Sequence, residues 1–164
     1  MANTIVLKNY LKIFEEFEAH EGITPGMLLE LNSDNEVQKH ATSGGNVIPP
    51  IFALEDELQG KGIDDAYIAG DTVQCWIPQR GDEVLALLAD GENVSIGEAL
   101  ESDGLGYLKA HTPESWSSAD AQEANTVYSR PIVAIALEAQ DLSGLEGSES
   151  SLATYTQRIK VKIV

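Results

Sequence analysis

The chain has 164 residues, 43% of them hydrophobic, and carries 27 Asp and Glu against 10 Lys and Arg, a formal net charge of −17. The length predicts a single domain, and the hydrophobic fraction excludes general disorder. The acidic charge argues against binding to nucleic acid or anionic membranes, because phosphate attracts cations and repels this chain. No apolar run reaches the roughly 18–20 residues needed to span a bilayer. With no signal-peptide layout at the N-terminus, we expect a soluble protein that stays in the cell where it is made.

Short apolar runs bounded by Gly, Pro, Asn, Asp or Ser predict strands through the first half of the chain. They cover residues 4–7, 27–31, 36–40, 51–54 and 73–77. In the last of these, Val73, Cys75 and Ile77 alternate with Gln74 and Trp76, which places Cys75 on a buried face. Two segments favour helix, although weakly: residues 9–19, with aromatic residues at helical spacing, and a single turn within residues 53–58.

The second half continues the same pattern. Residues 83–89 turn through Asp90-Gly91 into residues 93–96, a strong hairpin signal. Further strands are expected at residues 107–110, 132–139 and 156–163, with loops at 59–71, 111–129 and 141–151. About nine or ten short strands with frequent turns predict a mainly β fold, either a barrel or a sandwich.

The stretch from Val84 to Ala89 is apolar at six successive positions. A strand with one face exposed to solvent would instead alternate apolar and polar residues. Two interpretations stay open. The strand is buried on both faces inside the fold, or it lies at a contact between subunits. The second predicts that Val84, Leu85, Leu87 and Leu88 form the contact.

No chemical motif stands out. Phosphate-binding and nucleophile-elbow patterns are absent, and His20, His40 and His111 have no metal-ligand spacing. Cys75 is the single cysteine and has no base beside it in sequence. Acidic residues are so numerous that no carboxylate pair is diagnostic. We therefore expect no catalytic, metal-binding or cofactor-binding residues and no enzymatic activity; a β-barrel hydrolase with dispersed carboxylates is the less favoured alternative.

Three runs carry a family resemblance: ITPGMLLELNSDNEVQKHATSGGN, FALEDELQGKGIDDAYIAGDTVQ and GDEVLALLADGENVSIGEALESDGLGYLKA. Over roughly residues 22–110 the chain resembles the head decoration, or cement, proteins of tailed bacteriophages, and it is similar in role to the lambda-type decoration protein. The resemblance implies a small β-barrel or β-tulip domain over residues 21–164, long loops, and an extended N-terminal arm over residues 1–20.

The resemblance also implies a function. Such proteins bind the outer surface of the expanded head as trimers at three-fold positions and clamp neighbouring major capsid subunits. We therefore expect a virion structural protein, made in the host cytoplasm, whose partners are the phage major capsid protein and two copies of itself. Nucleic acid and membrane are not expected partners. Another structural virion component, a tail tube or head-completion protein, is the alternative.

In this family the arm can add a strand to the capsid protein's sheet. The β-branched run Thr4, Ile5, Val6 and Leu7 is the candidate here. An arm of this kind predicts that deleting residues 1–8 leaves the fold intact and weakens capsid binding. The sequence gives no role for loops 59–71 and 111–129.

Overall fold

The computed structural model describes residues 3–10, 13–45, 47, 49–113, 131–144 and 158–164. In these residues, regular structure consists of short β-strands and one 3₁₀ turn, η1 (Glu57–Gln59). The expected mainly β class is confirmed. The loop expected at 111–129 lies almost entirely outside the described residues, as does the second half of the loop at 141–151.

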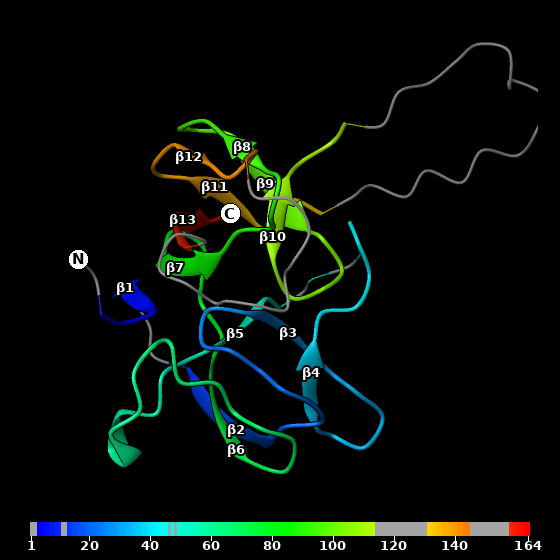
Figure 1. The fold of residues 1–164 in the computed structure, drawn as a ribbon, viewed down its shortest axis with the longest axis vertical. Helices are drawn as coiled ribbons and strands as arrows, with labels where there is room; N and C mark the ends of the chain where they lie inside the picture. The colour runs from blue at the N-terminus through cyan, green and yellow to red at the C-terminus, as the bar shows by residue number, and fades with distance from the viewer. Residues whose placement is uncertain (1–2, 11–12, 46, 48, 114–130, 145–157) are drawn as a thin grey trace, which may run out of the picture.

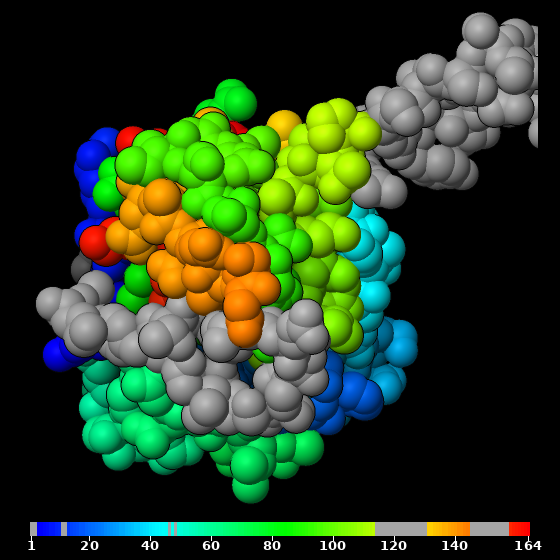
Figure 2. Space-filling view, turned by 45° about the horizontal axis from the view of Figure 1, so that its top comes forward, coloured from blue at the N-terminus to red at the C-terminus, as the bar shows by residue number. Residues whose placement is uncertain are grey.

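The strands form two large antiparallel sheets and a small two-stranded one (Figure 1). The six-stranded sheet has the order β1 (Val6–Lys8), β7 (Glu83–Leu87), β13 (Arg158–Ile163), β11 (Ala134–Ala136), β9 (Ala99–Ser102) and β10 (Leu108–Ala110). The five-stranded sheet has the order β2 (Phe14–Glu18), β6 (Thr72–Trp76), β5 (Ile51–Ala53), β3 (Leu28–Leu31) and β4 (Val37–Lys39). The pair β12 (Gln140–Asp141) and β8 (Asn93–Val94) lies at the surface, where orange residues meet green ones in Figure 2.

Neither large sheet closes into a barrel. A single parallel bridge, Ala19 to Val37, joins the chain after β2 to the opposite edge of the five-stranded sheet. A second, Leu88 to Leu108, links the end of β7 to β10. One bridge does not continue a ladder, so the expected barrel is corrected to two open sheets.

Strand β7 has an apolar core on each of its faces. Val84 and Ala86, with Leu88 just beyond the strand, belong to the first core, and so does Leu85, which departs from strict alternation. Leu87, like Ala89 just beyond the strand, belongs to the second core, which is built mainly on the five-stranded sheet. This arrangement explains the unbroken apolar run, because successive side chains of a strand point to opposite faces.

The prediction of a subunit contact on this strand is therefore wrong. Val84, Leu85, Leu87 and Leu88 are all buried within the chain itself. None of them offers surface to another subunit, and of the two interpretations the structure supports burial on both faces.

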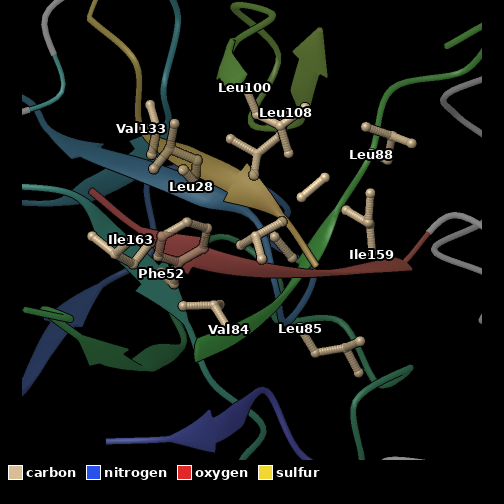
Figure 3. Packing of buried hydrophobic residues seen from close by; sticks show 14 of the residues in the cluster. Leu28, Phe52, Val84, Leu85, Leu88, Leu100, Leu108, Val133, Ile159 and Ile163 are labelled. Carbon is tan, nitrogen blue, oxygen red and sulfur yellow. The ribbon is translucent and has the colours of Figure 1, made fainter. Parts of the chain in front are cut away.

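Strands of the five-stranded sheet also divide their side chains between the two cores. Leu28 and Phe52 enter the first core, whereas the adjacent Leu29 and Ile51 belong to the second. Figure 3 shows Phe52 pointing toward β13, close to Ile163 and Val84. Strands of the five-stranded sheet therefore contribute side chains to both cores.

Residues 1–20 were expected to form an arm or a first strand, and the described part of this segment includes a strand that packs on the rest of the domain. β1 pairs with β7, with Val6 opposite Val84. Ile5 is fully buried in the first core, and its N–H donates to both carboxylate oxygens of Glu55, at 3.1 and 3.3 Å. A short apolar strand looks the same in sequence whether its partner is its own sheet or another protein.

The helix expected over residues 9–19 is also corrected, because residues 14–18 form strand β2. β2 pairs with β6 along its whole length, from Phe14 opposite Trp76 to Glu18 opposite Thr72. Phe17 packs on the second core, whereas Glu16 faces solvent. The turn expected within residues 53–58 is η1, which begins at Glu57 and ends one residue beyond the expected range.

Many acidic residues close turns. In three turns a glycine with positive φ precedes an acidic residue whose carboxylate accepts the N–H three residues back, as expected for tight turns that need φ above zero. The pairs are Ile68 with Asp71 at 3.0 Å, Gln79 with Asp82 at 2.8 Å, and Ser95 with Glu98 at 2.9 Å. Each turn leads into a strand, so these acids shape the fold.

A buried arginine joins the two sheets. Arg158, in β13, donates from Nη1 to the carbonyl of Pro25 at 2.7 Å and from Nη2 to the carbonyl of Ile63. Both carbonyls belong to loops of the five-stranded sheet. Gly26 makes the approach feasible, because a Cβ there would lie 2.6 Å from Nη1 and its φ of +91° favours glycine.

Replacing Arg158 should test this connection. Arg158→Met keeps an unbranched side chain but removes both donors, so two buried carbonyls lose their partner. We expect the free energy of unfolding to fall by about 2–5 kcal/mol, measured by chemical denaturation. Lys160→Met, on the same strand but exposed, is the control and should change it by less than about 0.5 kcal/mol. Equal stability of the two variants would contradict the role of Arg158.

A second prediction concerns the N-terminal segment. Ile5→Ala should lower the free energy of unfolding by about 2–5 kcal/mol, since it leaves a cavity in the first core. Ile96→Ala, at a residue that is 70% exposed, provides the comparison and should have little effect. An Ile5→Ala protein as stable as the wild type would restore the hypothesis of a detachable arm.

Candidate functional site

A groove of about 420 Å³ lies between β1 and η1. It is bordered by β1, by β2 and β6, and by the segment from the end of β5 into η1. The lining residues are Thr4, Val6, Asn9, Phe14, Leu54, Glu55, Glu57, Leu58 and Gln74. We call this hollow the β1–η1 groove.

Apolar side chains reach solvent in the groove. Leu58 is 92% exposed and Phe14 is 47% exposed, while Val6 and Leu54 are half-buried. Single exposed apolar residues are common, but several around one hollow are typical of a surface that another molecule covers. The β1–η1 groove is therefore a candidate contact surface.

Two strand edges border the groove. β1 is the end strand of the six-stranded sheet, and β2 is the end strand of the five-stranded sheet. Each pairs on only one side with a described strand. An end strand offers backbone N–H and C=O groups to a further strand. The groove thus combines apolar side chains with backbone that another chain can pair with.

Charges near the groove are mostly acidic. Glu57 is exposed at its rim, and Glu15, Glu16 and Glu18 are exposed along β2. Glu55 is buried and engaged with the N–H of Ile5. Lys8, at the end of β1, lies 3.8 Å from Glu83 and over the ring of Tyr10, and a hydrogen bond with Tyr10 raises the pKa of Lys8. The groove surroundings favour a cationic partner.

A Ser–His–Glu arrangement exists elsewhere but lacks the features of a hydrolase site. Nδ1 of His40 lies 2.7 Å from Oγ of Ser102, and Nε2 lies 3.7 Å from a carboxylate oxygen of Glu30. Ser102 is fully buried, and its Oγ also accepts the N–H of Gly104 at 3.2 Å. A neighbouring hollow of about 190 Å³ is lined by His40 and Glu30 but not by Ser102. A catalytic serine must be exposed to its substrate, and Ser102 is not. We therefore assign the hydrogen bonds of this cluster to holding the strands together.

The remaining histidines occupy separate places. His20 lies at the surface, with Nδ1 2.8 Å from a carboxylate oxygen of Glu36. Hydrogen bonds from Asn32 and, to a smaller extent, from His20 lower the pKa of Glu36. His111 contacts the fully buried Glu101 at 2.7 Å. Among the described residues no group of three His, Cys, Asp or Glu side chains is placed to hold a metal ion, and no helix is long and apolar enough to cross a bilayer.

Cys75 occupies the second core, as the alternation in sequence predicted. Burial, with a smaller effect of the Glu15 charge, raises the pKa of its thiol to about 12. Because the thiolate is the reactive form, the folded protein holds Cys75 unreactive.

This gives a direct chemical prediction. With its single cysteine, the native protein at pH 8 should react with a disulfide reagent such as DTNB only as fast as it unfolds. Denaturant should release one equivalent of thiol at once. Rapid labelling without denaturant would show that the second core is open around Cys75.

The predicted contact residues and the groove coincide only in part. Of the four arm residues, Thr4 and Val6 line the groove, Ile5 is buried, and Leu7 packs partly on the first core. Phe14 and Leu58 were missed, since nothing in their local sequence marks them as neighbours. The pattern FEEFE around Phe14 was interpreted as a weak helix, although as a strand it would have pointed to an acidic sheet edge.

Comparison with known proteins gives no assignment. No protein-family model matches the chain, and no curated protein matches it.

Proposed function

We propose that this protein is a capsid decoration protein that binds the outer surface of the expanded phage head and clamps major capsid subunits together. The observation that carries the proposal is the β1–η1 groove, where exposed Leu58 and Phe14 lie beside the sheet edges of β1 and β2. The resemblance of residues 22–110 to phage cement proteins supports it and suggests three copies at each three-fold position.

The net charge of −17 supports an outer position. Packaged DNA fills the inside of the shell, and its phosphates repel an acidic surface. On the outside, repulsion between free copies keeps the protein soluble until it meets a shell.

A cement protein acts through buried area and repeated contacts. One contact of about 1,000 Å² gives a specific interface. Once one contact forms, further contacts to neighbouring subunits are effectively intramolecular. Several contacts of modest affinity then give tight overall binding and slow dissociation.

Sedimentation with phage heads tests the proposal. The purified chain should co-sediment with expanded heads and not with unexpanded ones, and decorated heads should rupture at a higher temperature than bare heads. Native mass spectrometry gives the number of copies: three supports decoration at three-fold positions, whereas a ring of six favours a tail tube. A chain that stays in the supernatant with every expanded head would overturn the proposal.

A further inference from the structure

We propose that the β1–η1 groove receives an extended segment of the capsid protein in which apolar side chains alternate with Lys or Arg, and that this segment adds as a strand to β1. The inference rests on the proposed function and names the partner of that site. It reverses the direction expected from sequence, because this chain supplies the sheet and its partner supplies the strand.

The sheet edge defines the backbone part of the site. β1 pairs with β7 through Val6 and Lys8. Among the described strands it has no partner on its other side, and Thr4, Val6 and Asn9 of the same segment line the groove. The Glu55 carboxylate fixes Ile5 from the opposite wall, so β1 is held in place before a partner arrives. A pre-ordered edge lowers the entropic cost of strand addition.

The groove supplies apolar contacts for alternate side chains of an added strand. Phe14 comes from β2, Leu54 follows β5, and Leu58 projects from η1. An added strand presents every second side chain to one face. Its apolar residues would meet these three, and the intervening residues would face the rim.

The acidic residues at the rim determine which side chains of an added strand fit between its apolar residues. Glu57 is exposed at the rim, and Glu16 is exposed on β2, where it accepts from the Gln74 side chain at 2.8 Å. Lysine or arginine beside these carboxylates is favoured, and acidic residues are repelled. A second copy of this chain, at −17, meets the same repulsion. A cationic segment of another protein is therefore the occupant that the surface fits.

A labelled peptide in which Lys and Val alternate provides the probe, with fluorescence anisotropy as the measurement. We expect it to bind the full chain, more weakly as salt rises, and a matched Glu–Val peptide not to bind. Leu58→Asp should weaken binding by at least about tenfold, because it places a charge at the apolar contact. Ile96→Asp, at another exposed apolar residue that does not line the groove, should leave binding unchanged, and circular dichroism should show both variants folded.

Strand addition is tested with the same peptide methylated on alternate backbone nitrogens. Loss of binding supports pairing with β1, and undiminished binding overturns it. The groove assignment fails if the Glu–Val peptide binds equally well or if Leu58→Asp has no effect.

Head binding separates this inference from the proposed function. If wild type and Leu58→Asp bind expanded heads equally, the groove is not the capsid site, although the decoration role stands. If the Lys–Val peptide binds the groove but no head binds the wild type, the decoration role fails, and with it the capsid protein as occupant.

Discussion

Strand β7 must bury both of its faces, and the arrangement of the two sheets follows from that requirement. Val84, Leu85, Ala86 and Leu88 belong to the first core, while Leu87 belongs to the second. Such a strand is stable only between two apolar layers. Arg158 lies opposite Leu87 in the neighbouring strand and reaches the loops of the five-stranded sheet. Apolar burial and the buried Arg158 side chain therefore both hold the two sheets together where β7 and β13 pair.

This construction places the candidate contact surface at the margin of the two sheets. β1 ends one sheet and β2 ends the other, and the β1–η1 groove lies where they approach. Each edge strand is held by its neighbour, β1 by β7 and β2 by its full pairing with β6, and Glu55 also binds the N–H of Ile5 just before β1.

The sequence predicted strands well where turn residues bounded them. The alternation in β6 indicated the observed strand. The Asp90-Gly91 turn forms, but the hairpin expected there is wrong, because β7 pairs with β1 and β13 whereas β8 pairs with β12. β2 was missed because its phenylalanines are three residues apart, a helical spacing, and because its strand conformation depends on pairing with β6, far along the chain. The groove could not be predicted for the same reason: Phe14, Leu58 and Val6 are neighbours only after both sheets have formed.

Acidic residues fall into two groups that composition cannot separate. Asp71, Asp82 and Glu98 close turns, and Glu55 holds β1. Others, such as Glu57 beside the groove, face solvent. Only this second group can attract a charged partner, and the net charge alone does not show where these residues gather.

A cryo-EM map of expanded heads saturated with the protein tests the decoration role most directly. The account predicts density for this chain on the outer surface at three-fold positions, with an extended capsid segment lying along β1 and over Leu58. Heads without such density, or a chain attached with β1 and η1 turned to solvent, would contradict it.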